Sequence, residues 1–140
     1  MNGVQVNWNT EFGADKGELV RIYGVLDAAG IPMAKLLSVN EGGFVREDVQ
    51  GVNGLDLAVK GQVDSRVLQQ LEDMSEKAAA AGYNLDYFPE NFVVKDGCLI
   101  YVGLKFTRYL EEYSLENWGL PYWSRSPELE LYLQEYGQRG

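Results

Sequence analysis

The residue pair best suited to chemistry is Asp86 and Asn91, which lie five positions apart in the segment Asp86-Tyr87-Phe88-Pro89-Glu90-Asn91. An aspartate can accept the proton of a hydroxyl group, and an asparagine oxygen can ligate Mg²⁺ when a carboxylate shares the ion. Asp and Asn side chains also hydrogen-bond nearby backbone, so the same pair could simply hold the loop in its turn conformation. The pair is therefore a candidate site with two interpretations, one catalytic and one structural.

A tight hairpin is expected directly after this loop. Phe92-Val93-Val94-Lys95 and Cys98-Leu99-Ile100-Tyr101-Val102 are apolar runs separated only by Asp96-Gly97. Asp-Gly between two such runs is a strong hairpin signal, because both turn positions need a positive φ. Asp96 would lie at the far end of this hairpin, too distant to share a metal ion with Asn91.

The composition is that of one acidic globular domain. The 140 residues are 46% hydrophobic and 12% aromatic, which is enough to bury a core without disulfides or metals. A formal net charge of −9 argues against a nucleic-acid partner, because such proteins need clustered Lys and Arg. The sequence contains no histidine, which excludes Ser-His-Asp and Cys-His catalysis and His-ligated zinc.

The sequence also bears on location. Cys98 is the single cysteine, so no intramolecular disulfide can form, and its apolar neighbours predict a small buried side chain. The N-terminus lacks the basic-then-apolar pattern of a signal segment, and no apolar run approaches the ~18 residues of a spanning helix. We therefore expect a cytoplasmic protein with no membrane partner.

The spacing of apolar residues predicts an α+β chain. Val4, Val6 and Trp8 alternate with polar residues, as in a short strand with one apolar face. The elements expected, in chain order, are a strand over 4–9, a helix through 19–26 that stops at Gly30, a hairpin of 34–39 and 44–49, a connector over 50–62, a helix capped by Asp64 or Ser65 that stops at Gly82, the hairpin of 92–102, and a last helix capped by Ser126.

This order of elements, with these residues in it, resembles the protein-kinase-like fold, in particular the small bacterial branch that includes aminoglycoside and choline phosphotransferases. D-x-x-P-x-N leading into an Asp-Gly hairpin is more specific than D-x-x-x-x-N alone, which is common by chance. The resemblance implies one kinase-like domain over 1–140. Residues 1–50 would form a reduced N-terminal sheet with one helix, and residues 51–140 a mainly helical C-lobe carrying the hairpin.

The resemblance also implies roles for individual residues. Asp86 would be the catalytic base, and Asn91 a metal ligand, in an ATP- and Mg²⁺-dependent phosphotransfer. Glu18 opens the helix whose Glu normally pairs with a strand Lys. The residues that would border the nucleotide at the hinge are Glu47, Asp48 and Val49.

The chain departs from the family pattern at the positions that bind nucleotide and metal. Gly103 begins the triplet where an Asp-led, metal-binding triplet is expected, and the strand over 4–9 contains no Lys. Only three residues precede Val4, so the Gly-rich loop and its two strands are not found. Without the strand Lys, Glu18 is more simply a first-turn residue favoured by the helix dipole. We therefore expect no metal and no cofactor at this site, with ATP and Mg²⁺ as the alternative.

Three functions remain open on the sequence. The first is a degenerate kinase-like protein, a binding or regulatory module with little or no phosphotransfer. The second is an active small-molecule phosphotransferase that uses Asp86 as base and Asn91 as metal ligand. The third is an oligomeric structural domain that binds no nucleotide. Because Gly103 replaces a metal ligand, the first is favoured, and the protein is expected not to be an efficient enzyme.

Trp118, Tyr122 and Trp123 form an aromatic group near the C-terminus. Such a group could be a shelf for a ligand. Aromatic side chains at this density more often form a packed core or an interface, so the sequence favours that use.

The first strand suggests how the chain could assemble. Residues 1–9 contain no Lys, Arg, Asp, Glu or Pro that would keep another chain from pairing with an exposed strand edge. We therefore expect residues 4–9 to be covered, either by the same segment of a second copy across a two-fold axis or by a partner that donates a strand.

Overall fold

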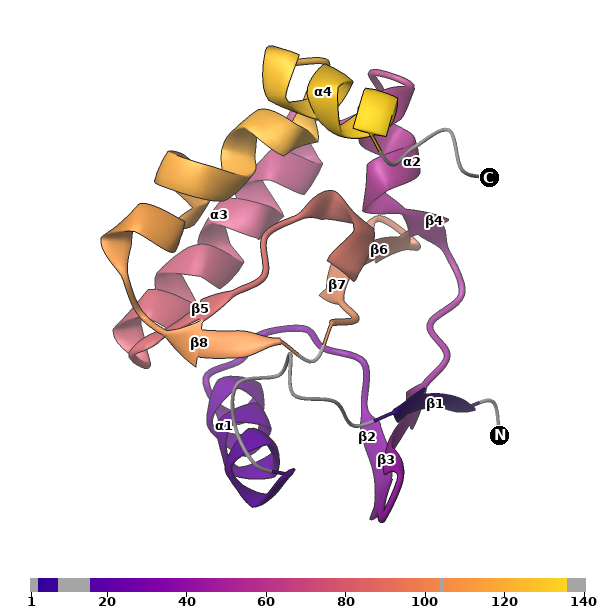
Figure 1. Ribbon diagram of the computed structural model, residues 1–140, viewed down its shortest axis with the longest axis vertical. Coiled ribbons are helices and arrows are strands. Elements are labelled where there is room, and N and C mark those ends of the chain that lie inside the picture. The colour runs from indigo at the N-terminus through magenta and orange to yellow at the C-terminus, as the bar shows by residue number, and fades with distance from the viewer. Residues whose placement is uncertain (1–2, 8–15, 104, 136–140) are drawn as a thin grey trace.

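The computed structural model describes residues 3–7, 16–103 and 105–135, which form an α+β arrangement of small antiparallel sheets and helices (Figure 1). The helices are α1 (Lys16–Ala28), α2 (Gly54–Val59), α3 (Ser65–Ala80) and α4 (Pro127–Glu135). The strands are β1 (Gly3–Asn7), β2 (Leu36–Asn40), β3 (Gly43–Glu47), β4 (Val52–Asn53), β5 (Tyr83–Leu85), β6 (Phe92–Lys95), β7 (Cys98–Tyr101) and β8 (Phe106–Arg108). Single helical turns cover Pro89–Asn91, Glu111–Tyr113, Leu115–Gly119 and Leu120–Trp123.

The first sheet confirms the predicted strand and hairpin of the N-terminal part. Its strand order is β1-β3-β2, with both neighbouring pairs antiparallel. β2 and β3 are joined by the two residues Glu41 and Gly42, since Asn40 pairs with Gly43. β1 and β2 are therefore the two edges of this sheet. Trp8 and Asn9, the end of the predicted first strand, lie outside the described residues.

The second sheet contains the Asp-Gly hairpin predicted from the sequence. β6 and β7 pair from Phe92 opposite Tyr101 to Lys95 opposite Cys98, which leaves a two-residue turn. Asp96 has a φ of 52° and Gly97 a φ of 81°, so both turn residues adopt the left-handed conformation that this turn requires. β4 adds a third strand beside β6, within the segment predicted as a connector.

The two long helices bury the faces that their apolar spacing predicts. α1 buries Leu19, Ile22 and Leu26, and α3 buries Val67, Leu71, Met74 and Ala78. The Asp64 carboxylate accepts a hydrogen bond of 3.0 Å from the Val67 N–H, so of the two predicted caps, Asp64 and Ser65, the structure selects Asp64. Gly30 and Gly82 follow the two helices with φ of 89° and 93°, the positive values for which glycine is favoured.

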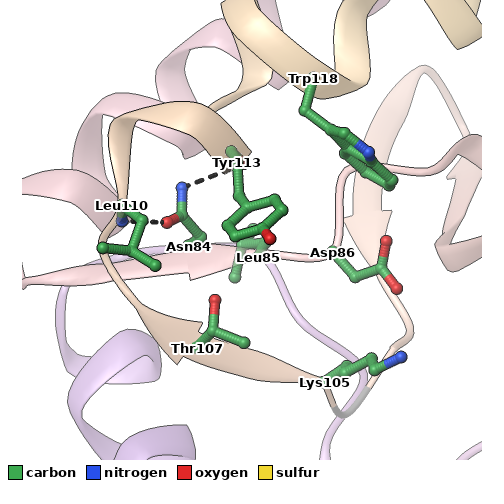
Figure 2. Close-up of a pocket in the computed structure, with 8 residues that line it drawn as sticks. All are labelled: Asn84, Leu85, Asp86, Lys105, Thr107, Leu110, Tyr113 and Trp118. Carbon is green, nitrogen blue, oxygen red and sulfur yellow. Dashed lines mark hydrogen bonds between the residues drawn. The ribbon is translucent and has the colours of Figure 1, made fainter.

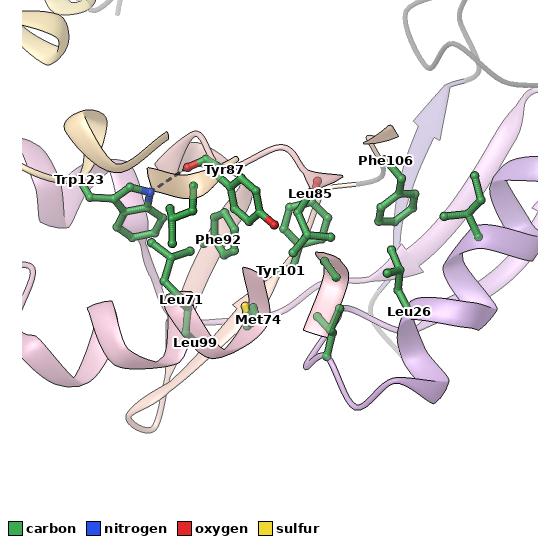
Figure 3. Packing of buried hydrophobic residues seen from close by; sticks show 14 of the residues in the cluster. Leu26, Leu71, Met74, Leu85, Tyr87, Phe92, Leu99, Tyr101, Phe106 and Trp123 are labelled. Atoms are coloured by element: carbon green, nitrogen blue, oxygen red, sulfur yellow. Dashed lines mark hydrogen bonds between the residues drawn. The ribbon is translucent and has the colours of Figure 1, made fainter. Parts of the chain in front are cut away.

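One hydrophobic cluster joins the N-terminal part to the rest of the chain. Leu26 of α1 and Phe106 of β8 lie at one end of it, and Trp123 lies at the other, with Tyr101 and Phe92 between them (Figure 3). The backbone of Tyr101 extends this connection: its N–H donates to the Pro32 carbonyl and its carbonyl accepts from the Ala34 N–H, both at 2.9 Å. The Asp-Gly hairpin is therefore bonded to the segment that enters β2.

The structure corrects one prediction about the hairpin. Cys98 is exposed, not buried, because it is the first residue after the turn and the inward positions of β7 are Leu99 and Tyr101. Besides β4, the strands β5 and β8 were also missed. They pair with each other over three residues each, from Tyr83 opposite Arg108 to Leu85 opposite Phe106. Segments this short carry too few residues for an alternating pattern to be recognised.

The turn geometry yields a testable prediction about stability. We expect Gly97→Ala to lower the free energy of unfolding by about 1–2 kcal/mol, because an L-residue is strained at a φ of 81°. Gly24→Ala is the matched control, since Gly24 lies within α1 with no atom near the position of an added Cβ. This second change should raise the free energy of unfolding by about 0.5–1 kcal/mol. Urea titration followed by circular dichroism measures both free energies. Equal effects of the two changes would contradict the left-handed conformation of Gly97 in the turn.

Candidate functional site

The loop over 86–91 brings Asp86 and Asn91 together. The Asp86 carboxylate accepts a 3.2 Å hydrogen bond from the Phe88 N–H, and the Asn91 side-chain amide donates to the Asp86 carbonyl at 3.4 Å. The Asn91 carbonyl accepts from the Val102 N–H at 2.8 Å, which fixes the end of the loop against the end of the hairpin. Both side chains therefore make the backbone contacts of the structural interpretation, and a catalytic role for either remains a prediction.

The buried side chain of Tyr101 holds this loop in place. The Tyr101 hydroxyl accepts a 3.1 Å hydrogen bond from the Asp86 N–H and donates one of 2.8 Å to the Lys105 carbonyl. Tyr101 is only 1% exposed. Burial raises the pKa of its phenol above the usual value, and the nearby negative charge of Asp86 raises it further. The hydroxyl therefore stays protonated and acts as a fixed link between the loop and Lys105.

Gly103 lies against the same tyrosine and against Asn91. A Cβ at position 103 would stand 2.9 Å from the Tyr101 ring and hydroxyl and 3.1 Å from the side-chain oxygen of Asn91. Position 103 is the one at which the resemblance places a metal-binding Asp. It lies next to Asn91, but it has no room for a side chain unless Tyr101 moves. Because Tyr101 is buried and bonded on both sides, that movement is costly.

Acidic side chains do not assemble a metal centre in the described residues. Within 3–7, 16–103 and 105–135, no three Cys, Asp or Glu side chains lie close enough together to hold a metal ion. Asp96 is at the turn of the hairpin, at the opposite end from Asn91, as its position in the sequence predicted. Asp86 and Asn91 alone supply too few oxygen ligands for a tightly held Mg²⁺.

The residues assigned to the nucleotide by resemblance lie elsewhere and have other partners. The Glu18 carboxylate lies 3.9 Å from the Arg21 guanidinium on the exposed face of α1, a pair that contributes little to stability. Glu47 accepts from the Lys35 N–H at 3.2 Å, and Asp48 from the Gln50 amide at 2.7 Å. The buried Val49 packs with Ala34 and Val93 in a separate cluster. None of these four residues lines the two cavities described next.

Two cavities flank Asp86. The first, of about 290 Å³, is lined by the polar residues Asn84, Asp86, Lys105 and Thr107 and by the apolar residues Leu85, Leu110, Tyr113 and Trp118 (Figure 2). The second, of about 370 Å³, is lined by Asp86, Phe88, Glu90, Asn91, Trp118, Tyr122 and Tyr132. Asp86 and Trp118 are common to both, so they form the shared wall.

The first cavity is shaped by a buried asparagine. Asn84 is 2% exposed, and its side-chain oxygen accepts from the Leu110 N–H at 2.7 Å while its amide donates to the Tyr113 carbonyl at 3.3 Å. These bonds attach the segment 110–113 to β5. The wall opposite Asp86 is therefore held in place by the fold itself.

The second cavity contains the aromatic group noted in the sequence, in part. Trp118 and Tyr122 contact each other at 5.5 Å between ring centroids, and Phe88 lies 5.3 Å from Tyr122 and 4.6 Å from Tyr132. Trp123, in contrast, is buried in the core, where its ring N–H donates to the Tyr87 carbonyl at 2.8 Å (Figure 3). Of the predicted aromatic group, one member is core and two are available to a ligand.

Lys105 is the residue that the sequence reasoning missed. It lines the first cavity, and in the sequence it is the last residue of the triplet that begins at Gly103, to which no role was assigned. The available signal was a single Lys directly before the apolar Phe106. That signal is weak, because most surface lysines are simply solvated.

Comparison with known protein families, with curated proteins and with solved structures gives no match for this chain. None of the helices in the described part combines the length and the apolar character needed to cross a bilayer. What the site can do is therefore argued from its own geometry.

The link formed by Tyr101 can be tested directly. Tyr101→Phe should lower the free energy of unfolding by about 1–3 kcal/mol, because the Asp86 N–H and the Lys105 carbonyl lose their partner. Tyr113→Phe is the control: Tyr113 is 49% exposed, so the change should stay within about 0.5 kcal/mol. Urea unfolding of both variants gives the comparison. A Tyr101→Phe variant as stable as the control would show that the hydroxyl does not hold the loop.

Proposed function

We propose that this chain is a protein-kinase-like binding or regulatory module with little or no phosphotransfer. The observation that carries the proposal is that Asn91, which is bonded to Asp86, lies against a glycine that Tyr101 leaves no room to replace. In the sequence, positions 86, 91 and 103 are the ones to which the resemblance assigns the base, the first metal ligand and the second metal ligand. Position 103 lacks the carboxylate of the second metal ligand, and the packing against Tyr101 favours a glycine there.

The charges around Asp86 further support binding without phosphotransfer. The second cavity has two carboxylates, Asp86 and Glu90, and no Lys or Arg among the described residues that line it. A triphosphate in this cavity would meet like charge, with no Lys or Arg in the described lining to offset the repulsion. Among the described residues that line the first cavity, Lys105 is the one cation, and the volume of about 290 Å³ suits a ligand smaller than a nucleotide.

Two alternatives remain proposals of lower rank. An active small-molecule phosphotransferase would still use Asp86 as base and Asn91 as metal ligand, and it requires ATP and Mg²⁺. An oligomeric structural domain would use neither residue chemically. Turnover of ATP would support the first alternative, whereas the absence of any small-molecule binding would support the second.

Nucleotide binding separates these possibilities. We expect no Mg²⁺-dependent rise in melting temperature with a non-hydrolysable ATP analogue, because one Asn does not replace a missing carboxylate. Gly103→Asp restores the carboxylate and Gly103→Ala is its steric control. Both should be destabilised by the contact with Tyr101, and neither should gain affinity for Mg²⁺ and nucleotide. A Mg²⁺-dependent shift in the unaltered protein that disappears in Asn91→Ala would contradict the proposal.

The edge position of β1 favours assembly through residues 4–9, as a homodimer or with a strand-donating partner. Light scattering at micromolar concentration should report a dimer, and Trp8→Lys, which adds a charge within the segment 4–9, should weaken it. Val39→Lys is the matched control, because Val39 is 46% exposed on β2, the opposite edge of the same sheet. A strict monomer would contradict the homodimer. If Val39→Lys weakens the dimer and Trp8→Lys does not, the interface is at β2 and not at residues 4–9.

A further inference from the structure

The first cavity has opposite charges at one end and an apolar wall at the other. Asp86 and Lys105 lie at the end beneath Trp118, whereas Leu110 lies at the opposite end and Tyr113 between them (Figure 2). In the part of the chain that the structure describes, the Lys105 ammonium forms no ion pair with a carboxylate. Both charges are therefore available to a ligand.

The Asp86 carboxylate is held in one orientation by a hydrogen bond to only one of its two oxygens. One carboxylate oxygen, Oδ1, accepts a hydrogen bond of 3.2 Å from the Phe88 N–H. The backbone N–H of Asp86 donates to the Tyr101 hydroxyl. The second oxygen has no hydrogen-bond partner among the described residues. The same tyrosine hydroxyl donates to the Lys105 carbonyl, so one buried residue fixes the backbone positions of both charged groups. A site whose charges are positioned before a ligand arrives binds with a smaller entropic cost.

From these features we infer that the first cavity binds a free α-amino acid with a large apolar side chain. The ammonium group of the ligand would lie between the Asp86 carboxylate and the face of the Trp118 ring. Its carboxylate would meet the Lys105 ammonium, and its side chain would cover Leu85, Leu110 and Tyr113. The inference deepens the proposed function and rests on it, because it names what the binding module would hold.

Other simple ligand classes fit this cavity less well. A plain anion would be repelled by Asp86, and a plain cation by Lys105. A wholly apolar compound would remove both charges from water without giving either a partner. The volume of about 290 Å³ is at the small end of ligand pockets, as an amino acid requires. A zwitterion with an apolar body satisfies the charges and the wall together.

Calorimetric titration of the intact protein with L-phenylalanine, L-leucine and L-tryptophan tests the inference. Phenethylamine lacks the carboxylate of phenylalanine, and 3-phenylpropanoate lacks the ammonium. We expect at least one of the three amino acids to bind, and both phenylalanine analogues to bind about 10-fold or more weakly than the amino acid they imitate. Absence of binding for all three amino acids, or equal binding of either analogue, would overturn it.

Variants identify the cavity as the place of binding. Lys105→Met keeps the alkyl chain and removes the charge, so it should weaken amino-acid binding about 10-fold and abolish the preference for phenylalanine over phenethylamine. Asp86→Asn keeps the acceptor for Phe88 and should abolish the preference over 3-phenylpropanoate. Lys95→Met is the matched control, because Lys95 is exposed on β6 and lines neither cavity. Affinity unchanged in Lys105→Met, or lowered equally in Lys95→Met, would place the binding elsewhere and overturn the inference.

The same titrations distinguish failure of this inference from failure of the proposed function. Mg²⁺-dependent binding of an ATP analogue would overturn the proposed function while leaving the amino-acid site standing. If the amino acids do not bind, the inference fails by itself, because the proposed function is tested separately by Mg²⁺-dependent nucleotide binding and by turnover of ATP.

Discussion

The buried hydroxyl of Tyr101 is the contact on which the arrangement of the site depends. It bonds to the backbone of Asp86 on one side and of Lys105 on the other, while the Tyr101 backbone pairs with Pro32 and Ala34. One residue thus joins the 86–91 loop, the end of the hairpin and the segment that enters β2. Phe92 and Phe106 enclose the Tyr101 ring at ring-centroid distances of 5.0 and 5.9 Å. A hydroxyl buried in this way without hydrogen bonds would lower the stability of the fold. The positions of the two charges at the first cavity follow from this link.

Close packing of Gly119 and Gly54 against the loop further limits how its backbone can move. A Cβ at Gly119 would stand 2.5 Å from the Tyr87 Cβ, and one at Gly54 would stand 2.6 Å from the Pro89 carbonyl oxygen. Tyr87 is itself buried, with its pKa raised to about 12 by desolvation. Because the segment 86–91 is enclosed in this way, its hydrogen bonds define a fixed surface for binding. This fixed geometry and the crowded Gly103 are the features that support the proposal of a binding module.

The two cavities share Asp86 and Trp118 but differ in the charge that lines them. The first combines Asp86 with Lys105, and the second combines Asp86 with Glu90. A ligand that meets a carboxylate alone must be cationic or accompanied by a metal, whereas one that meets both charges can be a zwitterion. The placement of one lysine therefore decides which small molecules suit each side of the loop.

The sequence by itself determined the elements whose signals are local. Asp96-Gly97 specified the turn of the hairpin, the pair Asp64-Ser65 the start of α3, and Gly30 and Gly82 the ends of two helices, because each depends on the backbone preferences of a few adjacent residues. The proximity of Asp86 to Asn91 was also predictable from the sequence, since the loop between them is short. Only the tertiary structure decided the pairing of β5 with β8, the exposure of Cys98, the crowding of Gly103 by Tyr101 and the place of Lys105 beside Asp86. Those features depend on contacts between segments distant in sequence or on which side of a strand faces the core, and no local pattern of residue types encodes them.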